Sequence, residues 1–323
     1  ICFYREKKMF NYFLNKEIAL VKFPIIFPII YGFILFTFPQ FETHLVILTI
    51  FLLAETHFGA TWPFFLDKVN FDHIKSKKIA FIAFPIFIIF FCLLGFLLIR
   101  DLFLLLFFAA NVYHVTRQSW GVCNLYCKKK EENKFQENLI YIVNSFFFFV
   151  AFFRFYYPII NEEIIFTFNI IVFLSIILLF CFYIYKFKYS ENFLTFVTGC
   201  LIFYPTCFVS NPVHAIIMGV TMHYTQYLYL THKVYTKRNT SVILDKNTNF
   251  YKKFFNKYVI TILIYSLIMA TFSNFGRLSD ELLKALIIIP ITGQMLHFYL
   301  DSQLWKFSEK HNRDNILRHI NSE

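Results

Sequence analysis

The sequence has few charged residues. Only 16% of its 323 residues are charged and 58% are hydrophobic, whereas a soluble globular protein carries about 25% charged residues. This shortage excludes an ordinary soluble domain and indicates an integral membrane protein. In a soluble protein the net charge of +11 would suggest nucleic-acid binding. Here we assign that charge to loops at one membrane surface, and we expect no nucleic-acid partner.

Glycine, cysteine and the usual histidine boxes are scarce or absent. The seven cysteines are scattered along the chain, which excludes a disulfide framework. Transporters commonly show internal repeats and broken helices, but there are only eight glycines and no repeat is evident. The patterns H-x-x-H-H and H-x-x-x-H are missing. Their absence argues against the membrane desaturases and hydroxylases, although not against iron chemistry in general.

What the sequence does contain is a series of long apolar runs. A helix needs about 20 apolar residues to cross ~30 Å of hydrocarbon. We therefore predict an all-α fold, a polytopic transmembrane helical bundle of about ten spans that forms a single integral membrane domain over residues 1–323. The predicted spans cover roughly 18–38, 44–66, 79–99, 102–126, 138–157, 164–185, 193–210, 212–232, 258–275 and 283–305.

Basic residues alternate between the connections of these spans. Of the 31 lysines and arginines, 25 fall in the two terminal segments and in the loops after the second, fourth, sixth and eighth spans. The other five connections hold only Arg100 and Arg277. Because cytoplasmic loops are rich in Lys and Arg, we expect both termini in the cytoplasm. The expected location is the bacterial inner (cytoplasmic) membrane.

Four of the predicted spans carry a histidine at nearly the same depth. These spans are the second, fourth, eighth and tenth, which run from outside to inside, and the residues are His57, His114, His223 and His297. Ionisable groups inside a membrane usually face the bundle interior and mark functional sites. Since imidazole is the commonest neutral metal ligand, the pattern predicts that the four histidines share one metal centre.

A second polar group follows each histidine by about one turn, on the same helix face. We expect some of these groups to orient the imidazole rings and others to take part in catalysis. The predicted ring-orienting, cofactor-binding residues are Thr61, Gln118 and Gln226, and the predicted catalytic residues are Asp301 and Arg117. Glu55 lies two residues before His57, about 200° round an ideal helix. It is therefore expected to face a neighbouring helix or to support the site from the side.

The leading hypothesis is a membrane metalloenzyme, a non-haem iron oxygenase that acts on an apolar lipid, isoprenoid or carotenoid. Imidazole ligands suit iron, and zinc or haem are alternative cofactors. A proton-coupled transporter or channel with His, Arg and Asp at the midplane is a second interpretation. A b-type haem protein for electron transfer is a third, because two histidines at equal depth can flank a haem.

Several motifs resemble those of known proteins. "YHVTRQSWGVCNLY", "MHYTQYLYL" and "LHFYLDSQLWKF" resemble motifs of bacterial multi-pass membrane proteins of undefined function. "HFG" at 57–59 and the step from His297 to Asp301 resemble the Brp/Blh family of membrane carotene dioxygenases. That resemblance implies four histidines on one iron in a helical bundle, with His57 and His297 as ligands, and cleavage of β-carotene. The family's His-Gly motif is absent from the first span, and its close histidine pair is replaced by His223 alone, so the substrate does not transfer.

Overall fold

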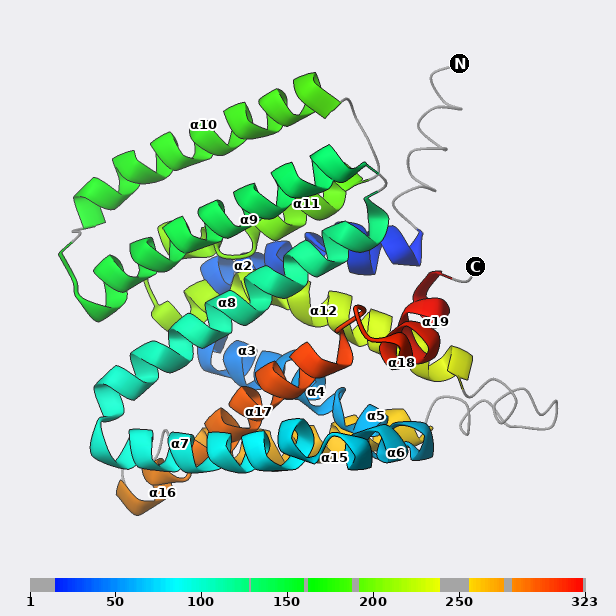
Figure 1. The fold of residues 1–323 in the computed structure, drawn as a ribbon. Coiled ribbons are helices and arrows are strands. Elements are labelled where there is room, and N and C mark those ends of the chain that lie inside the picture. Colours follow the sequence, from blue (N-terminus) through cyan, green and yellow to red (C-terminus); the bar gives the residue numbers. More distant parts are fainter. Residues whose placement is uncertain are drawn as a thin grey trace. The chain divides into compact units, whose positions relative to one another are not determined.

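The structure, a computed structural model, is helical throughout its described residues. These are 15–127, 129–159, 162–187, 192–238, 256–275 and 281–321, and they contain no β-strand (Figure 1). The all-α prediction is confirmed. The chain forms two compact units: unit 1 holds Ile1–Val46 and Asn111–Gln226, and unit 2 holds Ile47–Ala110 and Tyr227–Glu323. The single domain expected from the sequence stays a prediction, and the basic residues within 1–14 and 239–255 lie outside the described residues.

The elements follow one another in a simple order. The α-helices are α2 (Ile26–Thr37), α3 (Glu42–Thr49), α4 (Glu55–Gly59), α5 (Trp62–Phe65), α6 (Lys68–Ser76), α7 (Phe84–Leu98), α8 (Arg100–Tyr126), α9 (Lys130–Ala151), α10 (Glu162–Phe187), α11 (Asn192–Leu201), α12 (Pro212–Arg238), α15 (Lys257–Phe275), α16 (Glu281–Ala285), α17 (Ile288–Leu304), α18 (Lys310–Asn312) and α19 (Arg318–Asn321). Turns of π-helix cover Ile18–Lys22, Ile50–Ala54, Ile79–Ala83, Phe152–Tyr156 and Arg313–Leu317, and 3-10 turns cover Pro39–Phe41 and Tyr204–Cys207.

Six helical stretches among the described residues are long and apolar enough to cross a membrane. They are Pro39–Phe65, Ile79–Leu98, Lys130–Tyr156, Ile164–Phe187, Lys257–Phe275 and Leu283–Leu304. They correspond to the second, third, fifth, sixth, ninth and tenth predicted spans. The chain therefore has the character of a membrane protein, while the count of ten spans and the cytoplasmic termini stay predictions.

The other four predicted spans fall short of this standard for two reasons. The first and seventh are interrupted: 18–38 divides into a π turn and α2, and 193–210 divides into α11 and a 3-10 turn. The fourth and eighth form the long continuous helices α8 and α12. These two helices are richer in polar residues, and they are the ones that carry His114 and His223.

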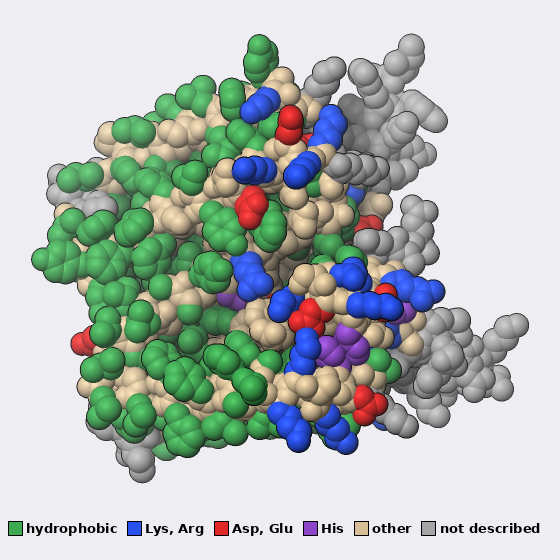
Figure 2. Space-filling view, in the orientation of Figure 1, with side chains coloured by type: hydrophobic (Ala, Val, Ile, Leu, Met, Phe, Trp, Pro, Cys, Tyr) green, Lys and Arg blue, Asp and Glu red, His purple; other side chains and the backbone are tan. Residues whose placement is uncertain are grey.

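Large apolar side chains cover the outside of several helices. On α7, Leu97 and Leu98 are 72% and 74% exposed, and on α10 Leu178 is 69% exposed. Figure 2 shows hydrophobic side chains over α7, whereas basic and histidine side chains gather over α6 and α18. Exposed apolar surface on this scale is unfavourable in water. A bilayer is the environment that accommodates it.

In unit 1 the helices α9, α10 and α11 lie side by side (Figure 1). Their shared core includes Ile140, Tyr183 and Phe196, all fully buried. The first half of α12 packs closely on Ile202, the residue that directly follows α11. A Cβ at Gly219 would lie 1.8 Å from the carbonyl oxygen of Ile202. Only glycine permits this close approach between the two backbones.

In unit 2 the helices α4, α15 and α17 pack together around small residues. A Cβ at Gly59 would lie 3.0 Å from the ring of Tyr265, and one at Gly293 would lie 2.7 Å from its hydroxyl. The two glycines thus make room for the Tyr265 ring of α15 between α4 and α17. Ser266 of the same helix donates a hydrogen bond to the carbonyl of Phe51, in the π turn that precedes α4. These contacts hold α4 in place.

Candidate metal centre

His57 lies on a short helix with irregular backbone on both sides. The π turn Ile50–Ala54 precedes α4, and such turns are frequent at functional sites because the extra residue redirects the following side chains. Pro63 has no N–H for the carbonyl four residues before it, so the helix is interrupted between α4 and α5. His57 is fully buried and Thr61, at the interruption, is 1% exposed. The local sequence therefore holds both side chains inside unit 2.

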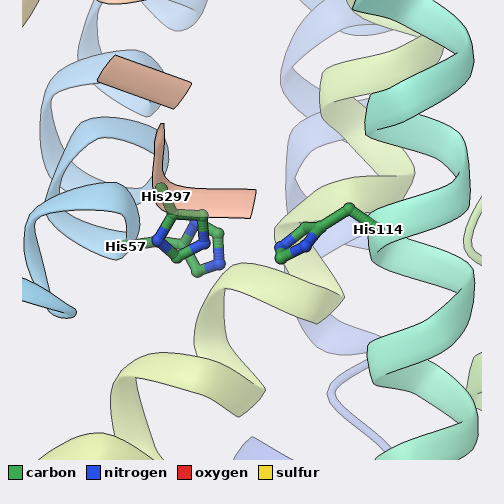
Figure 3. A group of neighbouring side chains, drawn as sticks. All are labelled: His57, His114 and His297. Atoms are coloured by element: carbon green, nitrogen blue, oxygen red, sulfur yellow. The ribbon is translucent and has the colours of Figure 1, made fainter. Parts of the chain in front are cut away.

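The ring of His57 lies beside that of His297, which α17 contributes. Their centroids are 4.6 Å apart and their planes are inclined by 65°. A ring nitrogen of each residue lies within 4.8 Å of the other. Two nitrogens that bind one metal at about 2.1 Å lie roughly 3 to 4 Å apart, so a small ring rotation would bring the pair to a common metal. Figure 3 shows the two rings side by side in unit 2, and His114 on α8 of unit 1.

A hydrogen-bonded chain links His297 to a carboxylate. The Nδ1 atom of His297 lies 2.8 Å from Oγ1 of Thr61, and this oxygen lies 2.9 Å from Oη of Tyr227. The Tyr227 hydroxyl donates to Oδ1 of Asp301 at 2.5 Å, and the Trp305 indole N–H donates to the same oxygen at 2.6 Å. Every residue of this chain belongs to unit 2.

The direction of the chain fixes the tautomer of His297. An ionised carboxylate only accepts hydrogen bonds. Because Tyr227 donates its one proton to Asp301, Thr61 must donate to Tyr227, and Nδ1–H of His297 must donate to Thr61. The lone pair of the ring is then on Nε2. A hydrogen bond from one ring nitrogen to a second group is the usual way in which proteins orient a histidine that ligates a metal.

Tyr227 is the central residue that the sequence did not reveal as functional. Its ring packs edge-on against His57, with centroids 4.6 Å apart, and its hydroxyl joins Thr61 to Asp301. The signal was present in the sequence, because Tyr227 follows His223 by four residues on α12 and therefore lies on the same helix face. Trp305 also joins this network, because its indole N–H donates to Asp301.

Unit 1 contains a second histidine pair. His114 of α8 and His223 of α12 have ring centroids 5.8 Å apart and nearly perpendicular planes. They are 7% and 2% exposed. The hydroxyls next to His114 bond to their own helix: Thr116 donates to the carbonyl of Val112. The structure therefore brings the four predicted histidines together as two buried pairs, one in each unit.

The predicted polar partners have different environments. Thr61 and Asp301 belong to the chain at His297, although Thr61 contacts His297 rather than His57, the residue with which the sequence associated it. Gln226 donates its amide N–H to the carbonyl of Val21 in the π turn before α2. Gln118 is half-buried and Arg117 is exposed on α8. The catalytic role of Arg117 stays a prediction, and its side chain lies off the buried face of α8 that holds His114.

The donor set of the site is chemically simple. In unit 2 it combines two imidazoles with a carboxylate that acts through two hydroxyl groups. Neutral imidazoles bind iron, zinc or copper and disfavour hard cations such as Mg²⁺. In comparisons with models of protein families, with curated proteins and with solved structures, no match to the chain was found.

Proposed function

We propose that this protein is an integral membrane metalloenzyme, a non-haem iron oxygenase that acts on a lipid-soluble, apolar substrate. The single observation that carries the proposal is the one-way chain from His297 through Thr61 and Tyr227 to Asp301. It presents the Nε2 lone pair of His297 beside the ring of His57, inside a stretch that is apolar enough to span a membrane. A buried polar chain of this kind is costly to maintain unless a ligand uses it.

The proposed ligands are His57 and His297 from unit 2, with His114 and His223 from unit 1. Support for the second pair comes from the sequence and from α12 itself. His223 and Tyr227 lie one turn apart on that helix, and Tyr227 contacts both His57 and His297. That all four imidazoles serve one metal stays a prediction, which the experiment below tests.

The chain's own residues would perform three tasks. The imidazoles would bind the metal. The series of hydrogen bonds that ends at Asp301 would hold the His297 ring in one tautomer. The aromatic surroundings, such as Phe58 against His297, would exclude water. A bound iron supplies an open coordination position for dioxygen, which protein side chains do not offer. The exposed apolar helix faces allow a substrate to approach from the bilayer.

The geometry counts against haem at the unit 2 pair. Two imidazoles on opposite sides of one iron, each with its nitrogen about 2 Å from the metal, have ring centroids roughly 6 Å apart. His57 and His297 are closer, at 4.6 Å, and their planes are steeply inclined. A haem between them would require the two helices to separate.

A proton-coupled transporter is the second candidate, and one observation favours it. A continuous series of hydrogen bonds connects an imidazole to a carboxylate at Asp301. Chains of this kind carry protons in pumps and transporters. In that case the four histidines and Asp301 would form a proton path and would not require a metal.

The metal content and the absorption spectrum of the detergent-purified protein test the proposal. We expect about one iron per chain without a Soret band, and its loss in His57→Ala, His297→Ala, His114→Ala and His223→Ala. The control is His44→Ala, since His44 of α3 is exposed. Retention of full metal in His114→Ala and His223→Ala would refute the shared centre. A Soret band would indicate haem, and absence of metal would favour the transporter.

A further inference from the structure

A second buried polar cluster of unit 2 includes Glu55 of α4. Glu55 is 1% exposed and belongs to the stretch Pro39–Phe65, which can span a membrane. Its Oε1 atom accepts a long hydrogen bond of 3.3 Å from the amide of Gln294 on α17. Its Oε2 atom has no hydrogen-bond partner among the residues that the structure describes. A buried carboxyl oxygen in this position is costly unless a ligand completes it.

The third member of the cluster is Tyr265 of α15. Its hydroxyl oxygen is buried and, like Oε2 of Glu55, has no hydrogen-bond partner among the described residues. Its ring occupies the space that Gly59 and Gly293 leave open, and the indole of Trp62 lies against it with centroids 6.4 Å apart. The phenol is thus held in a defined position, with its hydroxyl close to Gly293, the chain neighbour of Gln294. The three side chains come from three helices of one unit, α4, α15 and α17.

The cluster lies about one helical turn from the histidine pair. Glu55 precedes His57 by two residues on α4, and Gln294 precedes His297 by three on α17. Since Glu55 pairs with Gln294 and His57 with His297, the two helices run in the same direction here. At 1.5 Å per residue, the two levels are about 3 to 5 Å apart along the helix axes.

An apolar surface lies beside the cluster. Gln294 and Tyr265 are only half-buried. On α15, Ile264 and Leu267 next to Tyr265 are 56% and 60% exposed. Because α15 is itself apolar enough to span a membrane, a ligand that reaches the cluster from this side arrives through hydrocarbon.

A hydroxyl group is the ligand that these partners fit. A metal cation would need several oxygen ligands and a balancing charge, and the cluster offers one carboxyl group, one amide and one phenol. A hydroxyl both donates and accepts, so it pairs with a carboxyl group whether or not that group carries a proton. We propose that Glu55, Gln294 and Tyr265 form a subsite that binds the hydroxyl group of a long-chain lipid alcohol. The role of that alcohol as substrate rests on the proposed function, whereas its binding does not.

Photolabelling of the full-length protein in lipid nanodiscs tests this subsite. The probe is a long-chain fatty alcohol with a diazirine close to its hydroxyl group. We expect the label on peptides of α4, α15 or α17, and we expect competition by unlabelled fatty alcohol but not by its methyl ether. Glu55→Leu should reduce this labelling about tenfold or more, since it removes a buried hydrogen-bond partner. The matched control is Ser119→Ala, which removes a buried hydroxyl that only bonds its own helix.

The opposite results would overturn the subsite. These are label spread evenly over exposed helices such as α10, equal competition by alcohol and ether, or unchanged labelling in Glu55→Leu. The ether comparison uses the unaltered protein, so it decides the matter even if Glu55→Leu does not fold. Metal content is measured on the same samples. Specific labelling without bound metal would support the subsite while the metalloenzyme proposal fails, and bound metal without specific labelling would do the reverse.

Discussion

The imidazole Nδ1 of His297 lies 2.8 Å from the hydroxyl oxygen of Thr61, although the two residues are 236 positions apart in the chain. This contact connects α17 to the interruption between α4 and α5. It is the step at which the hydrogen-bonded chain from Asp301 reaches a proposed metal ligand.

Thr61→Val should weaken metal binding about 10- to 100-fold, the usual effect of removing the group that orients a metal-binding histidine. The shape of the side chain is kept, but Nδ1 of His297 loses its acceptor. The measurement is metal affinity by competition with a chelator. Thr56→Val is the matched control, because the Thr56 hydroxyl bonds only to carbonyls of its own helical segment. Equal affinities for both variants would contradict this interpretation.

Tyr227→Phe should break the chain in its middle. Asp301 would keep the Trp305 N–H but lose one donor, and Thr61 would lose its acceptor, so we expect the protein to lose about 1 to 3 kcal/mol of stability. The apparent melting temperature should fall with and without metal. Tyr299→Phe is the control, since Tyr299 of the same unit is partly exposed and stacks on Phe84. A melting temperature unchanged by Tyr227→Phe would show that the chain contributes nothing to folding.

Stability should depend on pH through the stacked rings of His73 and His311, which lie outside the spans, 4.0 Å apart and parallel. Burial lowers the pKa of both residues; the charge of Lys77 lowers that of His73 further, and that of His311 falls further beside His73. A histidine with a lowered pKa in the folded state stabilises the protein fully above its ordinary pKa of 6.5. This contribution decreases as the pH falls below that value and is lost as the pH falls through the lowered pKa of the folded state.

The measurement is the melting temperature between neutral and mildly acidic pH. It should fall less steeply in His73→Gln than in the unaltered protein. The carboxyl of Glu309 changes the pH dependence of stability only at lower pH, because its hydrogen bond with Lys77 lowers its pKa below the usual 4.5. As the pH falls, the loss of stability caused by His73 should therefore begin at a higher pH than the loss caused by Glu309. Identical pH profiles for His73→Gln and the unaltered protein would refute the assignment.

Two glycines of unit 1 should respond oppositely to alanine. Gly219→Ala would place a methyl group against the Ile202 carbonyl, which is backbone and cannot turn aside, so we expect a loss of about 3 kcal/mol or more. At Gly121, in the C-terminal part of α8, nothing lies within 4 Å of the added Cβ. Gly121→Ala should stabilise the protein by about 0.5 to 1 kcal/mol through helix propensity. Melting temperatures and folded yield of the two variants provide the check.

The helices and the buried histidines could be predicted from the sequence because both depend on local patterns. Apolar runs predicted where helices form, and the matched depth of His57 and His297 predicted that they would meet. The exposure of Arg117 was harder to foresee. It follows His114 by three residues, which is 60° away on a helix, and this offset is large enough to turn a side chain off the buried face.

The pairing of residues in the hydrogen-bonded series that ends at Asp301 could not be predicted in this way. The π turn before α4 and the interruption at Pro63 change which residues face each other. The π turn has no reliable sequence signal, and Pro63 indicates an interruption without showing which residues meet across it. Thr61 consequently contacts His297 on another helix rather than its own neighbour His57. The helices α8 and α12 were predicted to be spans, but they do not meet the hydropathy criterion because they contain too many polar residues.

The one-way direction of the chain has an electronic consequence. Each donated proton shifts slightly toward the next acceptor, and the last acceptor, Asp301, also receives the N–H of Trp305. The imidazole of His297 therefore becomes a stronger electron donor through Nε2 than an isolated ring. A redox-active metal bound there would give up an electron more readily, and its potential would be set in part by a carboxylate that it never touches.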